Sequence, residues 1–91
     1  MKPPVWRIEF DRDAARQLHK LAAPVRDAIR AYLRDKVATT LDPERFGKPL
    51  GAGLKGLWRY RVGDYRIVVR IEKGKLVVMV VAVAHRGTVY R

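Results

Sequence analysis

Residues 57–71 have the sequence Leu-Trp-Arg-Tyr-Arg-Val-Gly-Asp-Tyr-Arg-Ile-Val-Val-Arg-Ile, in which two runs of alternating side chains flank Gly63-Asp64. Alternation with period two, interrupted by a glycine-containing dipeptide, predicts a β-hairpin with a two-residue turn. In this register Val62 pairs with Tyr65, and Arg61 lies directly across from Arg66. One face of the hairpin is then apolar, and the other carries the arginines, namely Arg59, Arg61, Arg66 and Arg70.

Outward from the hairpin, periodicity predicts the order β-α-α-β-β-β within a single domain spanning residues 1–91. The predicted elements are a strand at Val5–Phe10, a helix capped by Asp11 and apolar at helical spacing to Ala22, a helix from Pro24 to Val37, a loop over residues 40–53, and strands at Lys55–Val62, Tyr65–Glu72 and Leu76–Ala84. We therefore expect an α+β fold, in which a helix hairpin packs on one face of an antiparallel sheet and leaves a basic face open.

The register of the last strand has two solutions in the sequence. A two-residue turn at Lys73-Gly74 places Met79 and Val81 on the arginine side of the sheet. A three-residue loop instead places Val78, Val80 and Arg86 there. In both cases the chain leaves the sheet near His85-Arg86, close to the Arg61/Arg66 end.

The composition favours an anionic partner. Twenty Lys and Arg against nine Asp and Glu give a net charge of +11 in 91 residues, a field that attracts nucleic acid or an acidic protein. Cysteine is absent and only two histidines occur, so we expect no disulfide, metal or other cofactor. The N-terminus leads directly into a strand, and no apolar run could span a bilayer, so we expect a cytoplasmic protein without membrane contact.

Arg61 opposite Arg66 is the most informative feature of the sequence. Like charges directly opposite one another on a sheet destabilise it by roughly 0.2–1 kcal/mol. Two arginines at this position are therefore expected where an anion such as phosphate sits between them. The alternative is that charged residues on an exposed strand serve solubility and edge protection.

The hairpin lacks the residues of the common hydrolytic sites. It has no paired carboxylates to hold Mg²⁺, and the chain shows no phosphate-binding glycine loop and no Ser or Cys triad. If this surface cleaves a phosphodiester, we expect a metal-independent reaction in which a 2′-hydroxyl attacks, which requires RNA. His85 is the nearby residue of the type that exchanges protons near neutral pH. Tyr90 can stack on a base or donate its hydroxyl, or it can anchor the C-terminus on the sheet.

The segment Gly56–Val68, followed by Val83-Ala84-His85-Arg86 and Val89-Tyr90, resembles the RelE branch of the RelE/ParE toxin superfamily. The resemblance covers essentially the whole chain. It implies the toxin of a type II toxin–antitoxin system. It further implies metal-independent cleavage of mRNA on the ribosome, with 2′,3′-cyclic or 3′-phosphate ends. A cognate antitoxin that wraps the toxin would block this activity, and we expect that antitoxin to be small, acidic and partly disordered.

The resemblance also implies roles for individual residues. The positions that the resemblance implies for RNA binding and catalysis are Arg59, Arg61, Arg66, Arg86 and Tyr90. We add Arg70, which shares the arginine side of the hairpin, to the RNA-binding set, and His85 to the catalytic set. Arg59 and Arg61 stand where the best-known member has lysines, and a guanidinium does not deprotonate at working pH. His85 is therefore the candidate acid or base. A ParE-like inhibitor of DNA gyrase and a non-catalytic RNA- or ribosome-binding module are the alternative functions.

Overall fold

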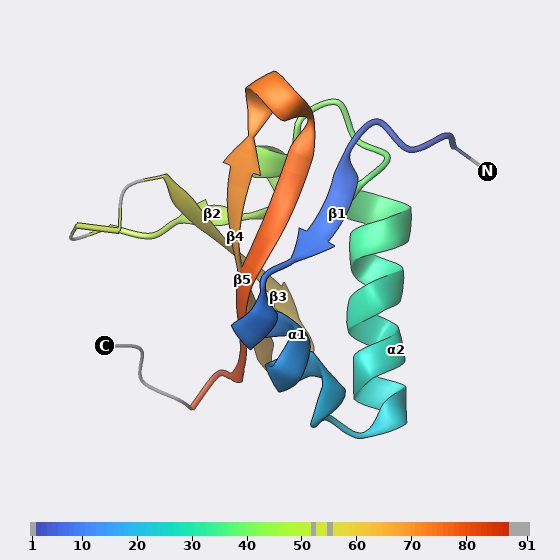
Figure 1. Ribbon diagram of the computed structural model, residues 1–91, viewed down its shortest axis with the longest axis vertical. Helices are drawn as coiled ribbons and strands as arrows, with labels where there is room; N and C mark the ends of the chain where they lie inside the picture. Colours follow the sequence, from blue (N-terminus) through green and yellow to red (C-terminus); the bar gives the residue numbers. More distant parts are fainter. Residues whose placement is uncertain (1, 52, 55, 88–91) are drawn as a thin grey trace.

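The computed structural model describes residues 2–51, 53–54 and 56–87, and it has two helices against a five-stranded sheet of order β1-β5-β4-β3-β2 (Figure 1). The elements are β1 (Arg7–Phe10), α1 (Arg12–His19), α2 (Ala23–Tyr32), η1 (Leu33–Val37), η2 (Pro43–Phe46), β2 (Lys48–Pro49), β3 (Leu57–Val62), β4 (Tyr65–Glu72), η3 (Lys73–Lys75) and β5 (Val77–His85). The predicted α+β class is confirmed, with element bounds shifted by a few residues. Among the described residues, no helix has both the length and the apolar character needed to cross a membrane.

The hairpin between β3 and β4 has the predicted register. Val62 pairs with Tyr65 and Arg61 with Arg66, so that Gly63 and Asp64 alone form the turn. Gly63 has a φ of 57° at the first central position, which is the position where a type II′ turn requires glycine. This turn matches the right-handed twist of the strands and fixes which side chains share each face.

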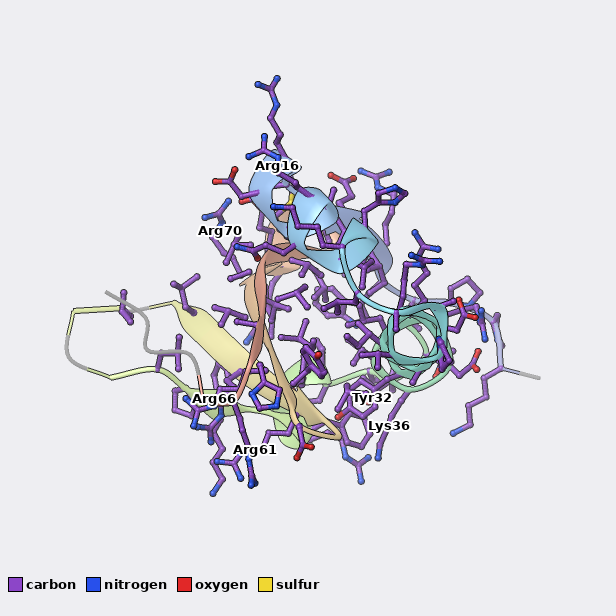
Figure 2. The ribbon with its side chains drawn as sticks, turned by 90° about the horizontal axis from the view of Figure 1, so that it is seen from below. Arg16, Tyr32, Lys36, Arg61, Arg66 and Arg70 are labelled. Carbon is purple, nitrogen blue, oxygen red and sulfur yellow. The ribbon has the colours of Figure 1, made fainter. Side chains whose placement is uncertain are left out.

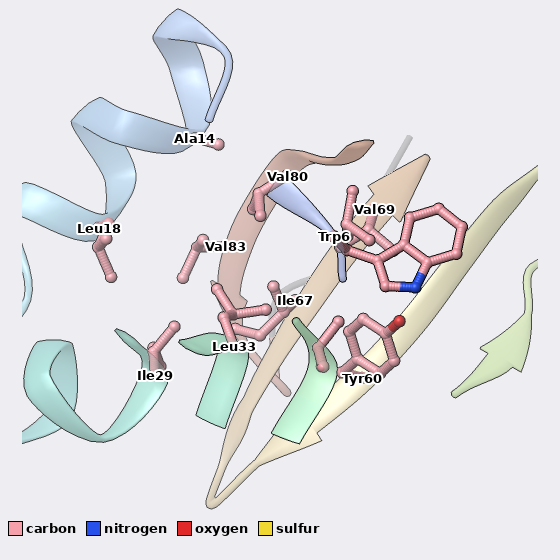
Figure 3. Packing of buried hydrophobic residues seen from close by; sticks show 12 residues of the cluster. Trp6, Ala14, Leu18, Ile29, Leu33, Tyr60, Ile67, Val69, Val80 and Val83 are labelled. Carbon is pink, nitrogen blue, oxygen red and sulfur yellow. The ribbon is translucent and has the colours of Figure 1, made fainter. Parts of the chain in front are cut away.

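The core lies between the two helices and one face of the sheet, which we call the helix face (Figure 3). Ala14 and Leu18 of α1 pack with Ile29 and Leu33 on the α2 side. The sheet contributes the buried side chains of Tyr60, Ile67, Val69, Val78, Val80 and Val83. Asp11 caps α1 as predicted, because its carboxylate accepts the Ala14 N–H at 2.8 Å.

One pair of strands differs from the antiparallel arrangement that we expected. β1 lies at the sheet edge and runs parallel to β5, with Ile8 opposite Val78. The two helices supply a crossover long enough for a parallel connection. The second helix continues into the short π-helix η1. The carbonyl of Ala38, which follows η1, accepts the N–H groups of Val5 and Trp6 at 2.7 and 3.0 Å. These bonds hold the N-terminal segment beside the core.

A β-bulge interrupts the pairing of β4 with β5. Arg70 lies opposite Met79 and Val69 opposite Val80, but Val68 lies opposite Ala82, so Val81 has no partner on β4. An extra residue of this kind reverses which side chains point to each face beyond it. Neither predicted register therefore holds along the whole strand. Before the bulge, Met79 lies on the arginine side of the sheet. After the bulge, that side carries Ala82, Ala84 and Arg86.

The predicted loop over residues 40–53 contains a further edge strand, β2, which pairs antiparallel with β3. Gly47, just before β2, approaches the sheet closely: a Cβ atom there would lie 2.9 Å from the Arg59 carbonyl oxygen and 3.1 Å from the Tyr60 ring. The Tyr60 hydroxyl donates to the Pro43 carbonyl at 2.6 Å, and burial raises the pKa of this phenol well above its usual range. These contacts fasten the segment before β2 to the sheet.

We expect Gly47→Ala to lower the free energy of unfolding by about 1–3 kcal/mol, because the added methyl group must push β2 away from β3. Gly51→Ala is the matched control, since a Cβ atom at Gly51 has no neighbour within 4 Å. Chemical denaturation of both variants measures the difference. Equal stability of the two variants would contradict the close approach at Gly47.

Candidate nucleic-acid interface

The arginine face is the side of the sheet defined by Arg59 and Arg61 of β3 and Arg66 and Arg70 of β4. Strand pairing places Arg61 directly across from Arg66, and Arg59 across from Val68. Figure 2 shows Arg61 and Arg66 close together, with Arg70 on the same side but apart from them and α2 on the opposite side. The four sequence-predicted arginines of the hairpin therefore do share one face.

Two of these arginines are partly buried without a hydrogen-bonding partner. The Nε atoms of Arg59 and Arg66 are shielded from solvent, and no acceptor contacts them within the described residues. Val68 lies beside them and is only 4% exposed, although both helices pack on the other face. The aliphatic stems of arginines commonly cover apolar neighbours in this way and leave the charged head outward.

The electrostatics of the cluster disfavour an empty site. Burial, followed by the charges of Arg61 and Arg66, lowers the pKa of Arg59 below the usual range for arginine. Leaving a buried donor unsatisfied costs about 1–3 kcal/mol. Oxygen atoms of a bound anion could accept from these donors and offset the repulsion between the three guanidinium groups.

The β5 bulge determines which residues lie beside the arginines. Ala84 is opposite Arg66 and Ala82 is opposite Val68, so small side chains flank the cluster on this side. Arg86 follows on the same side, and its backbone N–H donates to the Asp64 carbonyl at 2.7 Å. Its Nε lies 3.8 Å from a carboxylate oxygen of Asp64. Arg86 is thereby held against the turn that joins Arg61 and Arg66.

The structure does not place His85 on the arginine face. His85 pairs with Tyr65 and shares the helix face with Tyr65 and Val83 at the end of the strand. Its ring meets the Tyr65 ring edge-on, with centroids 5.4 Å apart, and its Nδ1 accepts the Gly87 N–H at 3.3 Å. Without the bulge, the parity that starts at Met79 would have brought His85 to the arginine face. The sequence suggested His85 because it follows the last strand close to Arg61 and Arg66 and is of the residue type that exchanges protons near neutral pH. Tyr90 lies outside the described residues.

Sequence reasoning missed Lys48. In β2 this residue pairs directly with Arg59, so the two residues lie side by side on the arginine face. The signal was weak, because β2 has only two residues and includes Pro49. Lys48 adds to this surface a cation that, unlike arginine, can exchange its proton.

The arginine face differs from a metal site or a small-molecule pocket. In the described part of the chain, no cluster of three or more His, Cys, Asp or Glu residues is placed to hold a metal. A hollow of about 840 Å³ lies elsewhere, between β1 and α2, where Ile8, Phe10 and Leu33 are among its lining residues. The arginine face thus presents cations on a sheet surface, which suits an extended anionic chain.

Three comparisons relate the chain to known proteins. The family model described as the ParE toxin of the type II toxin–antitoxin system parDE matches residues 8–90. Toxin RelG and toxin RelE of Mycobacterium tuberculosis are each 33% identical over 86 residues, which is 94% of this chain and 97% and 87% of those proteins. The crystal structure of the RelBE2 toxin–antitoxin complex from the same organism contains a chain that superposes with a TM-score of 0.83 at 31% identity, covering 96% of this chain and 98% of that one.

We expect Arg66→Gln to raise the free energy of unfolding at low ionic strength by about 0.2–1 kcal/mol, because it removes a like charge opposite Arg61. Inorganic phosphate should stabilise the unmodified protein more than the variant, since only the former keeps the complete anion site. Thermal unfolding with phosphate or with chloride at matched ionic strength measures both effects. Arg30→Gln, on the exposed side of α2, is the control. A phosphate response that Arg66→Gln leaves intact would argue against an anion site.

Proposed function

The chain belongs to the RelE/ParE superfamily of type II toxin–antitoxin toxins and is of the RelE type, and from this premise we propose that it is an endoribonuclease that cuts mRNA on the ribosome and so inhibits translation. The observation that carries the proposal is the facing pair Arg61 and Arg66, with the partly buried Arg59 beside it. Such a cluster is costly to the fold unless an anion occupies it. The scissile phosphate of an RNA strand is the anion that we assign to it.

In the proposed reaction the 2′-hydroxyl of one nucleotide loses its proton to water as its oxygen attacks the adjacent phosphorus. The new O2′–P bond gives a 2′,3′-cyclic phosphate as the P–O5′ bond breaks, and the departing O5′ takes up a proton. Arg61 and Arg66 would bind the non-bridging oxygens and offset the charge that grows on them in the transition state. Arg86, held by Asp64 at the same turn, would contact the same phosphate. We propose that the reaction needs no metal. We also propose that Tyr90 stacks on a base, as predicted from the sequence.

The proton that reaches O5′ needs a source other than arginine, because guanidinium groups keep their protons. We propose Lys48 for this role, since it lies on the arginine face opposite Arg59. His85, the candidate from sequence, lies on the helix face and engages Tyr65 and Gly87. In this proposal His85 supports the turn that carries Arg86.

A cognate antitoxin is the expected protein partner. The RelBE2 structure is described as a toxin–antitoxin complex, and its toxin-like chain covers nearly the whole length of this protein. The charge of +11 favours an acidic antitoxin whose disordered segment orders on binding. Because the proposed substrate is ribosome-bound mRNA, we place the activity in the cytoplasm.

A ParE-like inhibition of DNA gyrase is the second candidate, and the family model described as the parDE toxin favours it. The two candidates differ in what the arginine face does. A gyrase inhibitor has no need of a phosphate site with a protonated neighbour, whereas a ribonuclease depends on one.

We expect inducible expression of the protein to produce new mRNA 5′ ends at ribosome-bound positions, and Arg66→Ala to reduce these ends by about 100-fold or more, because the phosphate loses a contact made in the transition state. Genome-wide mapping of 5′ ends measures this. Growth arrest with intact mRNA and DNA damage would instead favour the gyrase function. Tight RNA binding without cut ends would favour the non-catalytic binding module.

A set of variants separates the proton donors. Lys48→Arg keeps the charge but not the transferable proton, so we expect it to lower the single-turnover cleavage rate by about 100-fold, within the range of general acid–base catalysis. We expect His85→Ala to lose less than about tenfold by the same measure, because only the support of Arg86 is weakened. The reverse order of effects would return the proton-transfer role to His85.

A further inference from the structure

The middle strand β4 alternates cation, apolar residue and cation along the arginine face. Arg66, Val68 and Arg70 occupy successive positions on this side. Arg66 faces Arg61 and Ala84, whereas Arg70 is flanked by Leu57 of β3 and Met79 of β5. Arg70 therefore has an apolar neighbour on each adjacent strand. Figure 2 shows it apart from Arg61 and Arg66.

Arg70 is an exposed cation without an acidic partner. Among the described residues, no carboxylate oxygen lies within 4 Å of its guanidinium group. Arg7 of β1 is a comparable exposed arginine on a strand, but its Nε lies 2.6 Å from a carboxylate oxygen of Glu9. Arg70 is thus available to bind an anion, whereas Arg7 already pairs with the carboxylate of Glu9.

The spacing favours separate anions at Arg66 and Arg70. Four residues along a strand place their Cα atoms about 13 Å apart, at about 3.3 Å per residue. Figure 2 shows Arg66 and Arg70 apart from each other on this side of the sheet. Exposed cations separated by more than the screening length of about 8 Å at physiological ionic strength act largely independently.

We propose that Arg70 binds a second phosphate of the same single-stranded RNA, so that the strand runs along β4 with one phosphate at the Arg61/Arg66 pair and another at Arg70. The part of the strand between these two phosphates would pass over Val68, which Arg59 and Ala82 flank on the neighbouring strands. The inference rests on the proposed function, because it extends the phosphate site at Arg66. It defines the substrate class as an unpaired strand long enough to reach both positions.

The test uses two uncleavable RNA probes in which 2′-O-methyl groups block the attacking hydroxyl. One is a dinucleotide with a single internucleotide phosphate, and the other is a hexanucleotide with five. Dissociation constants from NMR titration are compared for the unmodified protein, Arg70→Gln, Arg66→Gln and the control Arg7→Gln. We expect Arg70→Gln to weaken hexanucleotide binding by about threefold to fivefold, as for one exposed charge contact, and to leave dinucleotide binding unchanged. The salt dependence of hexanucleotide binding should also fall by about 0.7 in logarithmic slope.

The outcomes distinguish this inference from the proposed function beneath it. Equal weakening of both probes by Arg70→Gln would overturn the second phosphate position, because Arg70 would then act through the first. An unchanged affinity of Arg70→Gln for the hexanucleotide would also overturn it and would indicate that Arg70 binds an acidic protein instead. If Arg66→Gln leaves the binding of both probes unchanged, the phosphate site itself fails. If the two arginines act at separate phosphates, their effects on the hexanucleotide multiply in the double variant.

Discussion

The two-residue turn at Gly63-Asp64 is the constraint on which both the core and the candidate site depend. It sets Tyr60 opposite Ile67 on the helix face, and the same register sets Arg61 opposite Arg66 on the other. A change of one residue in the turn would exchange these faces and place guanidinium groups against the helices. The repulsion between the arginines is therefore a direct consequence of the pairing that builds the core. The protein still folds because burial of the apolar face stabilises it by far more than the roughly 0.2–1 kcal/mol that this repulsion costs.

Local signals carried most of what the sequence could predict. The β3–β4 hairpin, the cap at Asp11 and the face shared by four arginines all follow from residues close together in the chain. The features that were missed depend on distant partners. β1 joins β5 in parallel because the helix crossover brings it there, and β2 becomes a strand only by pairing with β3. The bulge was hidden because β5 is apolar at every position before His85, so that its alternation carries no register.

The arginine face would account for the proposed binding of RNA more readily than for selection of a sequence. Contacts to phosphate position a strand but do not identify its bases. The described part of this face offers cations and apolar side chains, with no cluster of amide or carboxylate groups suited to base edges. Selectivity in the proposed reaction would then depend on where the ribosome presents a strand to the toxin. An antitoxin that covers the same cations would compete with any RNA strand that binds there, whatever its sequence.

The apolar end of β5 beyond the bulge at Val81 has an evolutionary consequence. Removal of Val81 itself would leave every other pair unchanged, because Val81 is the residue without a partner. Removal of one residue between the bulge and His85 would instead keep an apolar strand against the core, since β5 is apolar up to Ala84, while reversing the end of the strand. The imidazole of His85 would then take the place beside Arg66, and the guanidinium of Arg86 would leave it. A single-codon deletion or insertion here is thus a step by which related proteins could exchange a proton-transferring ring for a fixed cation. Variation in the chemistry of such sites need not arise only by substitution of their residues.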